Sequence, residues 1–158
     1  MRSTFATELY IHMETNKNIW LVTADLGYGM WDKIRNDFPE RFLNTGASEQ
    51  AASDICVGLA LSGKTPFFYS ITPFLIYRCF ETIRTYINHE RINVKLVGSG
   101  RNDDYKHDGF SHDATDVESF LDQFGNINQY HPDTKEGIPG VLEEMLKSPN
   151  PGFISLRR

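Results

Sequence analysis

Glu49 is the residue whose position most directly suggests chemistry. It follows the small residues of the segment 44–48 and precedes a stretch, 55–61, that is almost purely apolar. An acid in the first turn of a helix is favoured by the helix dipole. A carboxylate at the head of a buried helix is costly unless another group pairs with it. We therefore expect Glu49 to be either an ordinary surface acid at a helix start or a buried, partnered acid with a function.

A second group of reactive side chains lies in the polar segment 98–112, which is too long to be a simple connection. This segment carries His107, Asp108 and His112. Histidine transfers protons near neutral pH. Aspartates and histidines at this density can also ligate zinc or manganese, although their spacing matches no standard structural site. A solvated polar loop is the third interpretation.

Gly98-Ser99-Gly100 opens this segment and resembles part of a dinucleotide-binding fingerprint. That fingerprint needs a third glycine and a helix that follows at once, within the first strand–helix unit of a domain. Neither the third glycine nor a clear helix follows Gly100, so the sequence does not favour this interpretation.

The order of helix and strand patterns predicts the scaffold that positions these residues. The patterns alternate from end to end, which indicates an α/β domain with a mostly parallel sheet of about six strands. We expect a single domain over residues 1–158. The expected strands are 19–23, 42–45, 65–70, 93–97, 128–130 and 152–156, and the expected helices are 3–14, 31–38, 48–62, 74–89, 116–124 and 134–147.

Ligands of parallel α/β sheets gather beyond the carboxyl ends of the strands. Four predicted connections begin there: the loop 25–29, the turn 46–49, the segment 71–74 and the segment 98–112. One edge of the sheet should therefore carry an acid, an aromatic side chain and a histidine-rich loop.

Composition argues against several classes of partner. The net charge is −5 and the pI is about 5.5, which does not favour a nucleic-acid partner. No apolar run approaches the roughly 20 residues of a membrane span, and the N-terminus has no signal-peptide core. We therefore expect a cytoplasmic protein with no membrane partner. Cys56 and Cys79 stand alone in apolar segments and are expected to be reduced, buried thiols.

Five groups of segments, in the same order, resemble the pyrimidine-binding (Pyr) domain of transketolase-like, thiamine-diphosphate-dependent enzymes. They are 23–26, 46–50, 58–67, 70–84 and 95–112. Each segment alone is weakly specific, but five in register are a specific match that covers essentially the whole chain. The resemblance implies the thiamine-diphosphate-binding fold, a three-layer, doubly wound α/β sheet with helices on both faces.

The resemblance also implies roles for residues that contact the cofactor. In that family a glutamate hydrogen-bonds the cofactor's pyrimidine ring and activates it, and Glu49 is the matching residue. Phe74 matches an aromatic side chain that stacks on the ring. Ile71 matches a second position that is usually aromatic, so it offers apolar contact without stacking. Asp25 is expected among the cofactor-binding residues, and one extra residue lies between Phe74 and Arg78.

The resemblance places the substrate near the histidine-rich loop. His112 is expected to be catalytic, and His107, Asp108 and His112 are expected to face a ketose or aldose. Arg101 stands where the deoxyxylulose-phosphate synthase branch carries an arginine for the substrate phosphate. Gly100 stands where transketolases proper carry a histidine, which argues against ordinary pentose-phosphate substrates.

The family holds the cofactor's diphosphate through Mg²⁺ on a second domain marked by a Gly-Asp-Gly segment, which this sequence lacks. The chain also ends at Arg158, just after the last predicted strand. We expect no metal site here and a separate diphosphate-binding (PP) subunit that holds thiamine diphosphate and Mg²⁺. A dimer of Pyr subunits within a heterotetramer would be natural.

The function expected from the resemblance is that of a transferase active only with its partner subunit. It would transfer a two-carbon ketol unit between phosphorylated or nucleotide-linked sugars, or condense pyruvate with an aldehyde. Two alternatives stay open. One is a subunit of a thiamine-dependent decarboxylase for sulfo- or phosphonopyruvate, and the other is a non-catalytic assembly module.

Overall fold

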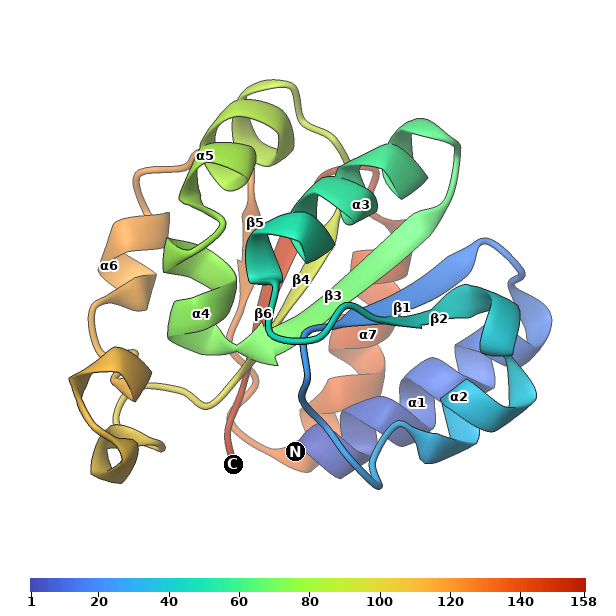
Figure 1. The fold of residues 1–158 in the computed structure, drawn as a ribbon, viewed down its shortest axis with the longest axis horizontal. Coiled ribbons are helices and arrows are strands. Elements are labelled where there is room, and N and C mark those ends of the chain that lie inside the picture. Colours follow the sequence, from blue (N-terminus) through green and yellow to red (C-terminus); the bar gives the residue numbers. More distant parts are fainter.

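Six parallel strands form one sheet in the order β2-β1-β3-β4-β6-β5 (Figure 1). The computed structural model describes all residues from 1 to 158. The strands are β1 Ile19–Thr23, β2 Phe42–Asn44, β3 Thr65–Ile71, β4 Lys95–Ser99, β5 Asn128–Tyr130 and β6 Gly152–Leu156. The expected α/β class is confirmed, and the sheet is parallel throughout.

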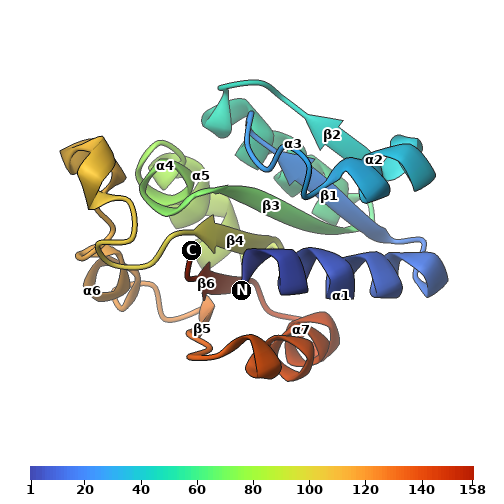
Figure 2. The ribbon, with the colours of Figure 1, turned by 90° about the horizontal axis from the view of Figure 1, so that it is seen from below.

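Helices cover both faces of the sheet, so the expected three-layer architecture is also confirmed (Figure 2). The α-helices are α1 Arg2–Thr15, α2 Asp32–Asp37, α3 Glu49–Leu61, α4 Thr72–Tyr77, α5 Phe80–Thr82, α6 Val117–Leu121 and α7 Ile138–Lys147. A π-helix spans Ile83–His89, and short 3₁₀ helices span Pro39–Arg41, Lys106–Asp108, Phe110–His112 and Lys135–Gly137. None of the helices has the length and apolar character that crossing a bilayer requires.

Alternate side chains of the strands feed two separate cores. Val22, Phe68 and Leu96 pack with α3, α4 and α6 on one face, whereas Leu21 and Phe67 pack with α1, α2 and α7 on the other. The central strands β3, β4 and β6 are almost entirely buried, as is typical of parallel strands covered by helices on both faces.

The predicted helix 74–89 is wrong as a single element. It begins at Thr72, is interrupted at Arg78 and Cys79, and continues as α5 and the π-helix Ile83–His89. The interruption directs Arg78 toward α3, with consequences for the site described below.

The glycines of Gly98-Ser99-Gly100 serve packing at the end of β4. A Cβ at Gly98 would lie 2.5 Å from the Thr72 hydroxyl and 2.9 Å from the Phe153 ring. Gly100 has a φ of +86° and lies directly against the Tyr105 ring. Gly98 and Ser99 belong to the strand rather than to the loop in which we expected them. These packing contacts account for both glycines, so no dinucleotide-binding role is needed to explain them.

Both cysteines are buried, as expected. Burial raises the pKa of Cys56 well above its ordinary value, and it raises the pKa of Cys79 to about 12. Neither thiol therefore forms a thiolate near neutral pH, and neither is a candidate nucleophile.

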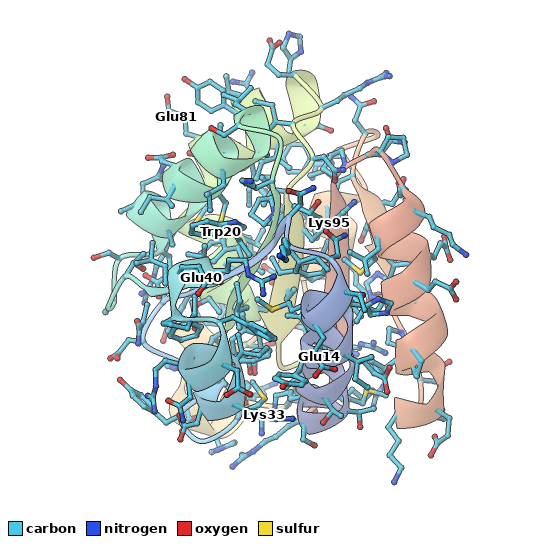
Figure 3. All side chains as sticks on the ribbon, turned by 90° about the vertical axis from the view of Figure 1, so that its right-hand side faces the viewer. Glu14, Trp20, Lys33, Glu40, Glu81 and Lys95 are labelled. Atoms are coloured by element: carbon cyan, nitrogen blue, oxygen red, sulfur yellow. The ribbon has the colours of Figure 1, made fainter.

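Lys95, at the start of β4, is a charged side chain with no solvent exposure (Figure 3). Its Nζ donates hydrogen bonds to the carbonyls of Ser148 and Asn150, at 3.0 and 2.7 Å. Burial lowers the pKa of Lys95 to about 8. The two hydrogen bonds fix the turn before β6, but burying the charged lysine away from water costs free energy.

We predict that the free energy of unfolding rises between pH 8 and pH 10 because of Lys95. In this range the folded chain releases the Lys95 proton while the unfolded chain retains it, so higher pH favours the folded state by about 2 kcal/mol. Urea unfolding at several pH values should show this rise relative to Lys95→Met, which has no such titration. Parallel pH profiles for the two proteins would contradict the assignment.

Candidate functional site

Glu49 is buried at the first position of α3, with its residue only 5% exposed. The turn that delivers it contains Gly46, whose φ of +68° favours glycine. The side-chain oxygen of Asn44 accepts hydrogen bonds from the backbone N–H groups of Gly46 and Asp25, at 2.9 and 3.1 Å. The turn is therefore tied to the loop after β1. Of the two expected possibilities, a surface acid and a buried acid, Glu49 is the buried acid.

Arg78 is the partner that the buried carboxylate requires. Its Nη1 lies 2.9 Å from both carboxylate oxygens of Glu49. The Arg78 side chain is 47% exposed, so solvent reaches the ion pair from one side. Arg78 is the C-cap residue of α4 and lies at the interruption between α4 and α5.

Phe74 extends the cluster on the other side of the guanidinium. The Arg78 guanidinium carbon lies 3.5 Å from the centroid of the Phe74 ring, a close cation–π contact. The His112 ring lies edge-on to Phe74, with the centroids 4.8 Å apart. Glu49, Arg78, Phe74 and His112 thus form one continuous group, which we call the Glu49 cluster. It joins α3, α4 and the 3₁₀ helix Phe110–His112, which lies beside α4 (Figure 1).

A polar network beside this cluster fixes α3 against α5. Gln50 Nε2 donates to the Thr82 hydroxyl at 2.7 Å, and Thr82 donates to Asp54 at 2.5 Å. Gln50 also donates to Asp54 at 3.1 Å. These bonds hold the first turn of α3 in place. They do not involve Glu49, whose carboxylate pairs with Arg78.

Ile71 and Asp25 lie at the same edge of the sheet, outside the Glu49 cluster. Ile71 ends β3 and is half-buried. Asp25 is exposed in the loop after β1, with a φ of +47°, and its carboxylate accepts a hydrogen bond from the Tyr28 hydroxyl. The strand order reverses between β1 and β3, which makes this the position where doubly wound sheets bind ligands.

The three reactive residues of the histidine-rich loop lie in two different environments. His112 is half-buried against Phe74, whereas His107 and Asp108 are exposed and lie 3.5 Å from each other. The His107 ring also lies 3.3 Å from Nη1 of Arg158. Only His112 of these three residues reaches the Glu49 cluster.

The Arg101 side chain is buried and bonded within the protein, whereas we expected it to face a substrate phosphate. It is only 5% exposed, and its guanidinium donates to the Ser155 hydroxyl at 3.1 Å and to the carbonyls of Ser155 and Pro132 at 2.6 and 2.9 Å. Burial lowers the pKa of Arg101. These internal hydrogen bonds commit the guanidinium to the end of β6, so we treat Arg101 as a positioning residue.

The alternative of a metal site finds no support in the geometry. No three side chains of His, Cys, Asp or Glu come together in an arrangement that could hold a metal ion. His107 and Asp108 lie together at the surface, but His112 lies apart from them against Phe74.

Arg78 is the residue of the cluster to which sequence reasoning gave no role. Its signal was present, because Phe74 and Arg78 are four residues apart and such residues share a helix face. The spacing did not identify Arg78 as the partner of Glu49, because the two residues are 29 positions apart and meet only in the folded chain.

Comparison with known proteins identifies the family of this architecture. The family model described as "Transketolase, pyrimidine binding domain" matches residues 1–158. An apulose-4-phosphate transketolase subunit of Actinobacillus succinogenes is 29% identical over 120 residues, covering 76% of this chain and 39% of that protein. A putative transketolase C-terminal section from Methanocaldococcus jannaschii is 26% identical over 159 residues, covering all of this chain and 50% of that protein.

A solved structure described as a split gene transketolase, inactive beta4 tetramer, superposes with a TM-score of 0.87 at 26% identity. The match covers 99% of this chain and 51% of that one. This chain therefore spans about half the length of that protein and half or less of the two curated relatives. Members of the family are thiamine-diphosphate-dependent transferases. The family model, the parallel sheet and the split relatives agree that this chain belongs to the transketolase pyrimidine-binding domain family.

Proposed function

We propose that this chain provides the pyrimidine-binding half of a split transketolase-like enzyme, with Glu49 as the residue that activates thiamine diphosphate. The observation that carries this proposal is the Glu49 cluster, in which a buried carboxylate and an aromatic face converge on one planar group. The bound cofactor supplies a nucleophilic thiazolium carbon that carries a two-carbon unit between sugars.

The residues present fit an aminopyrimidine ring. Such a ring is flat and presents nitrogen atoms at its edge, so it needs a stacking surface and a hydrogen-bonding carboxylate. Phe74 offers the surface and Glu49 offers the carboxylate, and the Arg78 guanidinium already makes both contacts in this structure. A guanidinium is itself planar and edged with N–H donors. We infer that Arg78 occupies the place of the pyrimidine and moves when the cofactor binds.

His112 is the proposed catalytic residue on the substrate side of the cluster. Its ring is held by the edge of Phe74 and by the Ser111 hydroxyl, which lies 3.1 Å from Nδ1. A histidine so placed can exchange a proton with a sugar hydroxyl near neutral pH. His107 and Asp108 remain proposed substrate contacts, because they are exposed and free to face a sugar. Asp25 and Ile71 remain proposed cofactor contacts.

The partner in this proposal is a diphosphate-binding, transketolase-like subunit that holds the cofactor's diphosphate and Mg²⁺. The names of relatives of this chain support it, because two of them are described as transketolase subunits. We propose two copies of each subunit, with the Pyr subunits paired. The ketol donor and acceptor are proposed to be phosphorylated or nucleotide-linked sugars.

We predict that Glu49→Gln lowers the turnover of the reconstituted complex by at least about 100-fold, the usual contribution of a positioned acid–base group. The assay mixes the chain with its partner subunit, thiamine diphosphate and Mg²⁺, and follows ketol transfer. Glu14→Gln, an exposed acid on α1, is the matched control and should leave turnover unchanged. Unchanged turnover in Glu49→Gln would refute the role of Glu49. Release of carbon dioxide without ketol transfer would favour the decarboxylase alternative.

We predict that Arg78→Met binds thiamine diphosphate more tightly than the natural chain, by about tenfold. The substitution removes the guanidinium that competes for Glu49 and Phe74, contacts together worth about 1–2 kcal/mol. Isothermal calorimetry on the complex with the partner subunit measures the dissociation constant without turnover. Arg84→Met, a substitution of an exposed arginine in the π-helix, is the control. Weaker binding by Arg78→Met would show that Arg78 supports the ring instead of occupying its place.

A further inference from the structure

We propose that Tyr105 is a positioning residue that sets the place of His112 in the Glu49 cluster, and that residue 100 is a glycine because the Tyr105 ring needs its space. The inference rests on the proposed function and deepens it, because it names what holds the proposed catalytic histidine. Tyr105 lies outside the Glu49 cluster and acts on it through the loop that it shares with His112.

The Tyr105 ring is packed into the end of β4. Gly100 has a φ of +86°, and a Cβ on Gly100 would overlap the ring. Gly100 stands where transketolases proper carry a histidine, so the ring here fills the space that such a side chain would need. The guanidinium carbons of Arg2 and Arg158 lie 5.9 and 5.4 Å from the ring centroid, where an aromatic face attracts a cation. Three neighbours therefore fix the ring.

The Tyr105 hydroxyl bonds to two other elements. Nη1 of Arg2, the first residue of α1, donates a hydrogen bond to the hydroxyl at 2.7 Å. The hydroxyl of Ser99, at the end of β4, lies 3.2 Å from the Tyr105 hydroxyl and is fully buried. Hydrogen bonds from a charged donor are among the strong ones in proteins. The tyrosine thus anchors the histidine-rich loop both to α1 and to the sheet.

Backbone hydrogen bonds extend this anchor to His112. The Tyr105 carbonyl accepts from the N–H of Asp108 at 2.9 Å, within the first 3₁₀ turn of the loop. The Gly109 carbonyl accepts from the N–H of His112 at 2.9 Å, within the second. The two turns are therefore held at one end by Tyr105 and at the other by the contact between His112 and Phe74. A displacement of Tyr105 changes where His112 meets Phe74.

Burial does not hold these turns in place. Every residue in the range 106–111 is exposed. The bridge between Asn102 and Ala114 closes the base of the loop, away from the turns. Lys106 lies 3.7 Å from Asp113, but its side chain is 67% exposed, and an ion pair with such an exposed partner contributes little. The anchor at Tyr105 is therefore the main attachment of the turns on the side away from His112.

The first experiment compares Tyr105→Phe with the natural chain by NMR of the histidine rings, without partner or cofactor. Phenylalanine keeps the ring and removes only the hydroxyl. We expect the ring signals of His112 to shift, because the ring current of Phe74 depends on distance and angle. The signals of His89, in the π-helix, should stay in place. Tyr86→Phe changes an exposed tyrosine of the π-helix and is the matched control, in which both histidines should keep their signals.

Arg2→Met removes the donor of the same hydrogen bond. It should shift the His112 signals in the same direction, and the double variant Arg2→Met/Tyr105→Phe should shift them little further than Tyr105→Phe alone. Arg2→Met also keeps the test valid should Tyr105→Phe fail to fold.

The second experiment uses the complex with the partner subunit, thiamine diphosphate and Mg²⁺. Tyr105→Phe should lower kcat about tenfold, the fold-change of one charge-assisted hydrogen bond. It should leave the dissociation constant of thiamine diphosphate unchanged, because Tyr105 contacts neither Glu49 nor Phe74. When His112→Gln is already present, adding Tyr105→Phe should lower kcat no further, because Tyr105 acts through His112.

Three results would overturn the proposal. They are unchanged His112 signals in Tyr105→Phe, an equal shift at His89, and an additive loss of kcat when Tyr105→Phe is combined with His112→Gln. A natural complex that shows no ketol transfer would instead refute the transketolase proposal. The NMR comparison needs no turnover, so it tests the anchor in either case.

Discussion

The buried carboxylate of Glu49 is the constraint on which the functional edge of this protein depends. A carboxylate at 5% exposure is tolerable only with a partner, and the structure meets this need with Arg78 at the interruption between α4 and α5. The guanidinium in turn covers Phe74, and Phe74 supports His112. One electrostatic requirement thus connects three elements that are separate in the sequence. In our proposal, the pyrimidine ring of the cofactor takes the place of the guanidinium.

The parallel sheet explains why these elements meet. Strands β1, β3 and β4 end at the same edge, and the connections that follow them contain Asp25, the start of α4 and the histidine-rich loop. Glu49 reaches this edge because β2 ends there and a short turn leads directly into α3. The two ends of the chain lie close together (Figures 1 and 2).

Much of this could be predicted from the sequence because the patterns are local. Short apolar runs bounded by turn residues identified the central strands, and the acid before 55–61 identified Glu49 as the central residue. What could not be predicted depends on contacts between distant residues. Arg78 pairs with Glu49 from 29 positions away, and the buried Arg101 guanidinium donates to Ser155, more than fifty positions away.

The most direct test of the central claim is a crystal structure of the complex between this chain, a diphosphate-binding partner subunit and thiamine diphosphate. Our account predicts that Glu49 lies within hydrogen-bonding distance of the pyrimidine ring, about 2.6–3.2 Å. It also predicts that the ring lies over Phe74 and that the Arg78 guanidinium has left both. A cofactor bound elsewhere, with the ion pair between Glu49 and Arg78 intact, would contradict it.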